Sequence, residues 1–348
     1  MNFNCDADVL NDFTLTRNLK NSTKKSYKTT LNLYADFNNA PFIDLLKEAE
    51  QEESNGIRWK YRRLKERLLK FRNFLSANYR KNYARITFSR IITLYRHYDI
   101  EIHALPSQSR KNYIESPPIT FGDLPDKNII RKALRRSDIK MKAITLFMLS
   151  SGCARRDTLN LTINDFITAT SQYHNEDDIS TVINILSKKR KVVPTFKLKR
   201  QKTGKYYYTF ITPEATRMIL NYLKTRNNLK SSNKLFEIHP ETLSRKFIKI
   251  NNQLGLGKSG TYNRYRSHNL RKFHASSLRN SGMLMEDINS IQGKSKTPTD
   301  EAYYFENPDV LKQRYVKHMN ALIIYNKNKV KEAQIPVRDN VDVFNINT

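Results

Sequence analysis

The chain has 348 residues, enough for two domains, and its 62 Lys and Arg outnumber 33 Asp and Glu, giving a formal net charge of +29. A chain this basic attracts polyanions, which makes nucleic acid the expected partner. A mean hydropathy of −0.68 without a long apolar run argues against a membrane partner. Only Cys5 and Cys153 occur, which excludes a disulfide framework and favours a reducing, cytoplasmic location. Neither a zinc motif nor a secretion signal is recognisable, so we expect no metal and no cofactor.

The N-terminal part of the chain has a helical pattern. Residues 1–15 resemble a short, partly loose leader, and residues 16–105 are expected to form a helical domain. Within it an apolar stripe recurs at i, i+4, i+7 and i+11, which predicts a helix face turned to a core. The stripe consists of Leu64, Leu68, Phe71 and Leu75. The opposite face carries Arg63, Lys65, Arg67, Lys70 and Arg72. These bases form either a solvated face or a clamp on the DNA backbone, and the net charge favours the clamp.

Residues 106–120 are predicted to be a linker, because prolines interrupt them and no apolar period runs through them. Arg110 and Lys111 of this linker could contact DNA between the two domains. A second domain is expected over 121–325, followed by a weakly ordered tail over 326–348. Its predicted helices span 126–136, 139–150, 155–160, 178–187, 213–226, 240–253, 268–281, 283–292 and 307–325.

Two stretches rich in β-branched and aromatic residues, 192–199 and 205–211, predict a hairpin with residues 201–204 at its tip. The fold class is therefore mainly α with a small antiparallel β-sheet. The last predicted helix has an apolar stripe of Leu311, Tyr315, Met319 and Leu322. This stripe docks either on a neighbouring protomer or on its own domain.

The most informative motif is His268-x-x-Arg271, which places two side chains one helical turn apart on the same face. Tyr303 and Tyr304 follow about thirty residues later. Breaking a phosphodiester without a metal requires a nucleophile, cationic donors for the non-bridging oxygens and an acid for the leaving oxygen. Tyrosine, arginine, and lysine or histidine suit these three tasks.

The motifs follow one another in the order seen in the integrase family of tyrosine recombinases, which the chain resembles over 121–325. They are Ser150-Ser151-Gly152-Cys153-Ala154-Arg155-Arg156-Asp157 with Leu161 and Asp165, Lys202-Thr203-Gly204, His268-x-x-Arg271, Gly293-Lys294 and Tyr303. The N-terminal helices resemble the family's core-binding domain in pattern. The segments Gly293-Lys294-Ser295 and Asp300-Glu301-Ala302-Tyr303 are similar to those of the archaeal-like branch of the family. The resemblance implies a helical core-binding domain joined to a mixed α/β catalytic domain.

The resemblance implies six catalytic residues: Arg155, Lys202, His268, Arg271, Lys294 and Tyr303. The two arginines would clamp the phosphate, the hairpin lysine would protonate the leaving 5′ oxygen, and the histidine would accept the tyrosine proton. The chain departs from the family where Ala154 stands at the usual place of the first arginine, which leaves Arg155 and Arg156 as candidates. Lys294 replaces the usual His or Trp and is either an active-site donor or a surface lysine. Tyr303, nine residues further on, is favoured over Tyr304 as the nucleophile.

The resemblance implies a site-specific DNA recombinase, encoded by a mobile element, that needs neither ATP nor metal and forms a 3′-phosphotyrosine intermediate. The implied partners are double-stranded DNA with specific recombination sites, three further copies of the chain in a tetramer, and accessory DNA-bending proteins. The expected location is the cytoplasm, at the nucleoid. Two alternatives remain: a type IB topoisomerase-like enzyme that relaxes DNA, and a recombinase-derived protein that binds DNA without cutting it.

Overall fold

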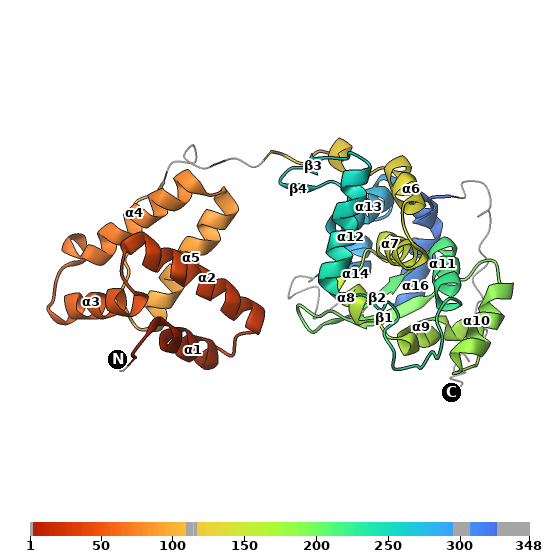
Figure 1. Cartoon of the computed structure of the whole chain (residues 1–348), viewed down its shortest axis with the longest axis horizontal. Coiled ribbons are helices and arrows are strands. Elements are labelled where there is room, and N and C mark those ends of the chain that lie inside the picture. The colour runs from red at the N-terminus through yellow and green to blue at the C-terminus, as the bar shows by residue number, and fades with distance from the viewer. Residues whose placement is uncertain (1–2, 109–113, 115–116, 295–306, 326–348) are drawn as a thin grey trace, which may run out of the picture. The chain divides into compact units, whose positions relative to one another are not determined.

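The computed structural model describes residues 3–108, 114, 117–294 and 307–325 (Figure 1). Tyr303, Tyr304, Arg110, Lys111 and the predicted tail lie outside these described residues. The chain divides into two compact units, Met1–Pro117 and Pro118–Thr348. Helices predominate in both units, and the described strands form two small antiparallel sheets. The predicted fold class, mainly α with a small antiparallel sheet, is confirmed.

The described secondary structure of unit 1 is helical, apart from an isolated β-bridge between Arg80 and Ile114. Its helices are α1 (Asp6–Thr16), α2 (Asn21–Asn38), α3 (Phe42–Ser54), η1 (Trp59–Tyr61), α4 (Arg63–Asn78) and α5 (Lys81–His97). The predicted stripe on α4 is confirmed, because all four of its side chains are buried. They pack with Tyr34 of α2 and Phe42 of α3, whose rings lie 6.2 Å apart. Burial of these aromatic and aliphatic side chains stabilises unit 1.

The expectation of a loose leader over residues 1–15 is wrong, because α1 is an ordered helix within unit 1. Its Val9 and Phe13 are fully buried. The Asp6 carboxylate accepts hydrogen bonds from the backbone N–H groups of Phe42 at 3.0 Å and Ile43 at 2.8 Å, which satisfies the free donors at the start of α3. The acidic residues near the N-terminus thus act as a tertiary cap.

The basic face of α4 is partly paired with carboxylates. Glu48 of α3 lies 3.4 Å from Arg63 and 2.8 Å from Arg67. Glu66 lies 2.6 Å from Lys70 on the same helix. Exposed pairs of this kind contribute little stability and can exchange for other anions. The pairs therefore weaken the clamp interpretation for this face without removing it.

Unit 2 surrounds the long buried helix α7 (Ile139–Ser151) (Figure 1). Ten of its residues are buried, and it contacts the helices and strand that carry the candidate site. The other helices are α6 (Lys127–Arg135), α8 (Arg155–Asn160), α9 (Ile163–Thr170), α10 (Ile179–Lys188), α11 (Pro213–Leu223), α12 (Pro240–Gln253), α13 (Ser267–Asn280), α14 (Met285–Ile291) and α16 (Pro308–His318), with short 3₁₀ turns at η3 (Phe121–Asp123), η4 (Ser171–Tyr173) and η5 (Met319–Leu322). The sequence did not predict α9.

The predicted hairpin is confirmed. Strands β1 (Thr195–Lys199) and β2 (Tyr206–Phe210) pair antiparallel, with Lys199 opposite Tyr206. The backbone N–H of Arg200 donates to the Lys205 carbonyl at 2.8 Å, which closes the turn. A second hairpin, β3 (Lys258–Ser259) with β4 (Tyr262–Asn263), was not predicted.

The helix expected over 307–325 ends earlier, at His318, and continues as the 3₁₀ turn η5. Its apolar stripe packs within its own unit, which decides between the two docking alternatives. The Tyr315 hydroxyl donates to the Ser150 carbonyl at the end of α7 at 2.9 Å, and the Tyr315 ring lies 5.4 Å from that of Phe210. Among the described residues, no helix is both long and apolar enough to cross a membrane.

Candidate active site

Helix α13 presents His268 and Arg271 one turn apart, because they are spaced i, i+3. Leu270, His274 and Leu278 of the same helix are fully buried and fix it in unit 2. The Arg271 guanidinium is held from two sides. Its Nη1 donates to the Gly152 carbonyl at 2.6 Å, and its Nη2 donates to the Gln292 carbonyl at 2.7 Å. These bonds fix the planar group while using only two of the five N–H donors that a guanidinium carries.

Gly152 ends α7 in a left-handed conformation with φ +64°, and a side chain there is excluded by His274. A Cβ on Gly152 would lie 2.6 Å from the His274 Nδ1 atom. The His274 ring is fully buried, and Gln292 Nε2 donates to its Nδ1 at 3.0 Å. Burial, with the charges of Arg271 and Lys294, lowers the pKa of His274 to about 3. His274 is therefore a neutral packing residue that supports the loop beneath Arg271.

Gly293 and Lys294 follow α14 and lie against the hairpin. Gly293 has φ +61°, and a Cβ there would lie 2.7 Å from the ring of Tyr207 on β2. This close approach explains why a glycine precedes Lys294. The pKa of Lys294 is lowered by partial desolvation and by the charges of Arg271 and Arg200. Lys294 therefore belongs to the same electrostatic environment as Arg271.

His268 is exposed to solvent at the start of α13 in a positive environment. Desolvation lowers its pKa first, followed by the charges of Arg266, Lys272, Arg271 and Lys294. A histidine whose pKa is lowered in this way is neutral at pH 7 and can accept a proton.

Arg200, directly after β1, also joins this group. Its Nη1 donates to the Gly293 carbonyl. Its charge lowers the pKa of both Arg271 and Lys294. We refer to Arg200, His268, Arg271 and Lys294 as the cationic cluster. Sequence patterns give Arg200 no role in the site, because its contact with Gly293 spans 93 positions and leaves no local signal.

The hairpin is tied to helix α8 through Asp157. The Asp157 carboxylate accepts a hydrogen bond from the Gln201 backbone N–H at 3.1 Å and one from the Tyr207 hydroxyl at 3.5 Å. The Cys153 thiol lies 3.4 Å from the same hydroxyl. Burial raises the pKa of the Cys153 thiol. Asp157 thus anchors the hairpin.

Two other predicted residues lie at the hairpin tip and on α8. Lys202 is exposed at the hairpin tip, between Arg200 and Gly204. Arg155 is exposed at the start of α8, and its Nη1 donates to the Ser244 hydroxyl on α12. The structure thus gathers His268, Arg271 and Lys294 with Arg200 and directs Arg155 to α12. Tyr303, the expected nucleophile, is not among the described residues.

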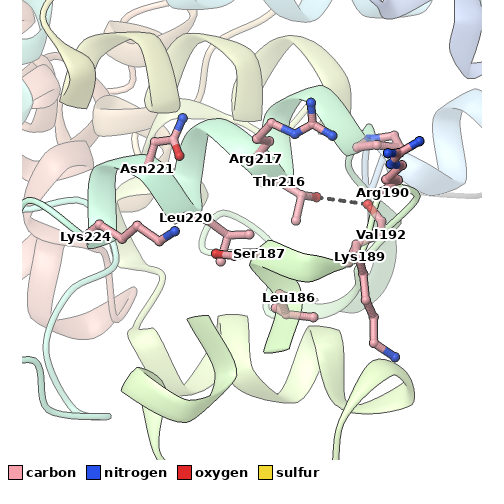
Figure 2. Close-up of a pocket in the computed structure, with 11 residues that line it drawn as sticks. Leu186, Ser187, Lys189, Arg190, Val192, Thr216, Arg217, Leu220, Asn221 and Lys224 are labelled. Carbon is pink, nitrogen blue, oxygen red and sulfur yellow. Dashed lines mark hydrogen bonds between the residues drawn. The ribbon is translucent and has the colours of Figure 1, made fainter. Parts of the chain in front are cut away.

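Figure 2 shows a separate basic hollow between α10 and α11, with a volume of about 150 Å³. Its basic lining residues are Lys189, Arg190, Arg217 and Lys224. The Thr216 hydroxyl closes one side by donating to the Val192 carbonyl at 3.2 Å. None of these residues belongs to the cationic cluster, so they provide matched positions for charge-removal controls.

Comparisons with known proteins bear on the fold. No protein-family model matches the chain, and no curated protein matches it by sequence. A lambda integrase tetramer bound to a Holliday junction matches with a TM-score of 0.53 and 13% identity, covering 86% of this chain and 76% of that one. A lambda integrase (75–356) dimer bound to a COC' core site matches with a TM-score of 0.53 and 12% identity, covering 86% and 98%. The Tn1549 transposon integrase in complex with transposon right end DNA matches with a TM-score of 0.46 and 14% identity, covering 89% of this chain and 98% of that one. The likeness to lambda integrase establishes that this chain has the tyrosine recombinase fold.

Proposed function

We propose that the protein is a site-specific DNA recombinase of the integrase type, which cleaves and rejoins strands through a 3′-phosphotyrosine intermediate. One observation carries the proposal. Arg271 is fixed by two backbone carbonyls, and after desolvation the charges of Arg271 and Lys294 are among those that lower the pKa of His268. A phosphodiester gains negative charge on its non-bridging oxygens during attack, and fixed cations stabilise that charge.

In the first step, the phenol oxygen of Tyr303 attacks the scissile phosphorus, and the bond from phosphorus to the 5′ oxygen breaks. His268 takes the phenol proton, since its lowered pKa leaves it neutral at pH 7. Lys202 donates a proton to the departing 5′ oxygen. Arg271 and Lys294 bind the non-bridging oxygens, and the sequence resemblance gives Arg155 the same role.

In the second step, the 5′-hydroxyl of a partner duplex attacks the phosphotyrosine, and the phenol leaves with its proton restored. One ester replaces another in each step, so the energy of the broken bond is conserved and no ATP is consumed. Two such exchanges between two DNA sites pass through a Holliday junction, which a tetramer of the chain would hold.

The wider setting follows from the same proposal. Unit 1 would act as the core-binding domain, with residues 106–120 as the linker over DNA. The sequence around Lys294 and Tyr303 supports an origin in an archaeal-like mobile element. The site of action would be the cytoplasm, at the nucleoid, with DNA-bending proteins as accessory partners. With about ten phosphate contacts, affinity would fall about 10³–10⁵-fold between 50 and 200 mM salt.

A binding-only protein is the second candidate. Ala154 stands where the family usually places its first arginine, and Arg155 is engaged with Ser244 on α12. A recombinase that had lost cleavage would retain the basic surface and the fold. A topoisomerase-like enzyme would retain cleavage but would relax supercoiled DNA without joining two sites.

A nicked duplex tests cleavage directly. The binding site is first selected from a random-sequence pool with the full chain, and the duplex is then nicked beside each position in turn. Cleavage releases a short 5′-hydroxyl fragment that diffuses away, so the covalent adduct accumulates and is measured on a denaturing gel. We expect an adduct with the wild type and with Tyr304→Phe, and none with Tyr303→Phe.

The controls separate the candidates. Binding of the selected duplex without any adduct at any nick position would establish the binding-only protein. Relaxation of a plasmid that lacks the selected site, without recombination between two plasmids that carry it, would favour the topoisomerase. Recombination of the two site-bearing plasmids supports the proposed recombinase.

A further inference from the structure

We infer that Arg200 is a phosphate-binding residue of the active site and, together with Arg271, supplies the pair of guanidinium groups that clamps the scissile phosphate. The inference rests on the proposed function. It assigns this role to the end of strand β1, whereas sequence reasoning assigned it to the start of α8.

The position of Arg200 is fixed by three hydrogen bonds of its own and one of its neighbour Gln201. Its backbone N–H and carbonyl both close the hairpin turn, bonding Lys205 and Gly204 at 2.8 Å each. The next residue, Gln201, donates its backbone N–H to Asp157. The guanidinium itself donates to the Gly293 carbonyl, directly before Lys294. A half-buried arginine held in this way is oriented in advance for a ligand.

Arg155 is placed differently. It is exposed, and its guanidinium donates to Ser244 on α12. Arg200, in contrast, donates to the Gly293 carbonyl, next in the chain to the Gln292 carbonyl that accepts from Arg271. After desolvation, the charge of Arg200 is one of the causes that lower the pKa of Arg271 and Lys294. Of these two arginines, the structure therefore associates Arg200 with the residues that the proposed chemistry requires.

A purely structural role accounts for only part of this arrangement. The bond to the Gly293 carbonyl uses one N–H, and a neutral amide could make it. A full positive charge beside Arg271 and Lys294 instead repels both of these cations in the free protein. A phosphate bridging the guanidinium groups relieves the repulsion and uses their remaining donors.

The first test needs neither a DNA site nor catalysis. Phenylglyoxal modifies accessible guanidinium groups, and peptide mass spectrometry follows each arginine of the full chain separately. We expect inorganic phosphate to slow modification of Arg200 several-fold and to leave Arg156 and Arg155 unchanged. An Arg200 rate that is the same with and without phosphate overturns the inference.

The second test uses the nicked duplex. Arg200→Gln keeps a donor for the Gly293 carbonyl but removes the charge, and we expect it to slow adduct formation about 10²–10³-fold. Arg217→Gln, in the hollow of Figure 2, is the matched control and should react at the wild-type rate. A methylphosphonate at the scissile position carries no negative charge for Arg200 to bind. With this substrate, the ratio of the wild-type rate to the Arg200→Gln rate should therefore be at least about ten-fold smaller. Circular dichroism and a thermal melt check that the variant is folded, and Arg200→Lys provides a second variant that retains the charge.

The outcomes distinguish this inference from the proposed function. If the wild type forms the adduct and Arg200→Gln forms it equally fast, Arg200 is not a clamp and the recombinase remains. If phosphate protects Arg200 but no duplex yields an adduct, the recombinase proposal fails and the anion-binding role of Arg200 stands. A defect that methylphosphonate leaves unchanged assigns Arg200 a structural role and overturns the inference.

Discussion

Replacing Gly293 by alanine should destabilise unit 2 through two separable effects. The first is backbone strain: φ is +61°, and a Cβ in this region costs about 1 kcal/mol. The second is a collision, because the new Cβ would lie 2.7 Å from the Tyr207 ring. That ring is buried and contacts Cys153 and Asp157, so it cannot swing aside. Forced overpacking adds about 1–3 kcal/mol.

Gly255→Ala is the matched control for the strain alone. Gly255 has φ +59° in the same unit, and nothing lies within 4 Å of its added Cβ. We therefore expect Gly255→Ala to lower the free energy of unfolding by about 1 kcal/mol and Gly293→Ala by about 2–4 kcal/mol. The difference between the two variants measures the collision with Tyr207.

Urea denaturation followed by circular dichroism provides the assay. The sole tryptophan, Trp59, lies in unit 1, so its fluorescence reports a transition that neither substitution touches directly. Equal destabilisation by the two alanines, within about 0.5 kcal/mol, would refute the reasoning, since it would mean that the hairpin yields to the new methyl group. Gly293→Ala should also slow adduct formation more than Gly255→Ala, because the Gly293 carbonyl holds Arg200.

Three further predictions concern charged groups. Lys312 is 3% exposed, and burial lowers its pKa to about 8. Between pH 8 and 10.5 the folded state therefore binds fewer protons than the unfolded state, so the protein gains stability as pH rises through that window. Lys312→Met should therefore be more stable than the wild type by about 2–3 kcal/mol at pH 7 in urea denaturation, a gap that narrows towards pH 10.5; a pH-independent gap contradicts this. The rate of adduct formation should stay level as pH falls through 6.5 and drop only below it, because the pKa of His268 is lowered; a midpoint at or above 6.5 excludes His268 as the base. Glu48→Gln on α3 releases Arg63 and Arg67 of α4, so it should steepen the slope of log K for DNA binding against log salt concentration by about one. Asp44→Asn, also on α3, should leave this slope unchanged, and equal slopes for the two variants argue against the clamp.

Local patterns in the sequence predicted the elements that local rules govern. The stripe from Leu64 to Leu75 and the hairpin around Gly204 both follow from side-chain periodicity and turn chemistry. Helix α1 was missed although Val9 and Phe13 are one turn apart, because its cap is completed by residues far along the chain. Asp6 bonds the start of α3 more than thirty-five positions away.

In the candidate site, too, local sequence patterns predict some residues, whereas the positions of others depend on contacts with distant parts of the chain. His268 and Arg271 are one turn apart in sequence, so their common face could be predicted. Arg200 could not be found in this way, because its place depends on how closely Gly293 approaches Tyr207. Arg155 was favoured for its position in a motif, and only the structure shows that its guanidinium reaches Ser244.

The type of acceptor separates the structural arginines from those with charge available for a ligand. Arg67 on α4 and Arg314 on α16 are bound by carboxylates, at 2.8 Å from Glu48 and 2.7 Å from Asp287, so much of their charge is neutralised within the protein. Arg271 and Arg200 are held by backbone carbonyls, which are neutral and fix the geometry while leaving the net charge intact. Such an arrangement is unfavourable in the free protein and favourable around an anion. Among 62 lysines and arginines, composition cannot make this distinction, because it depends on which acceptor the fold brings to each side chain.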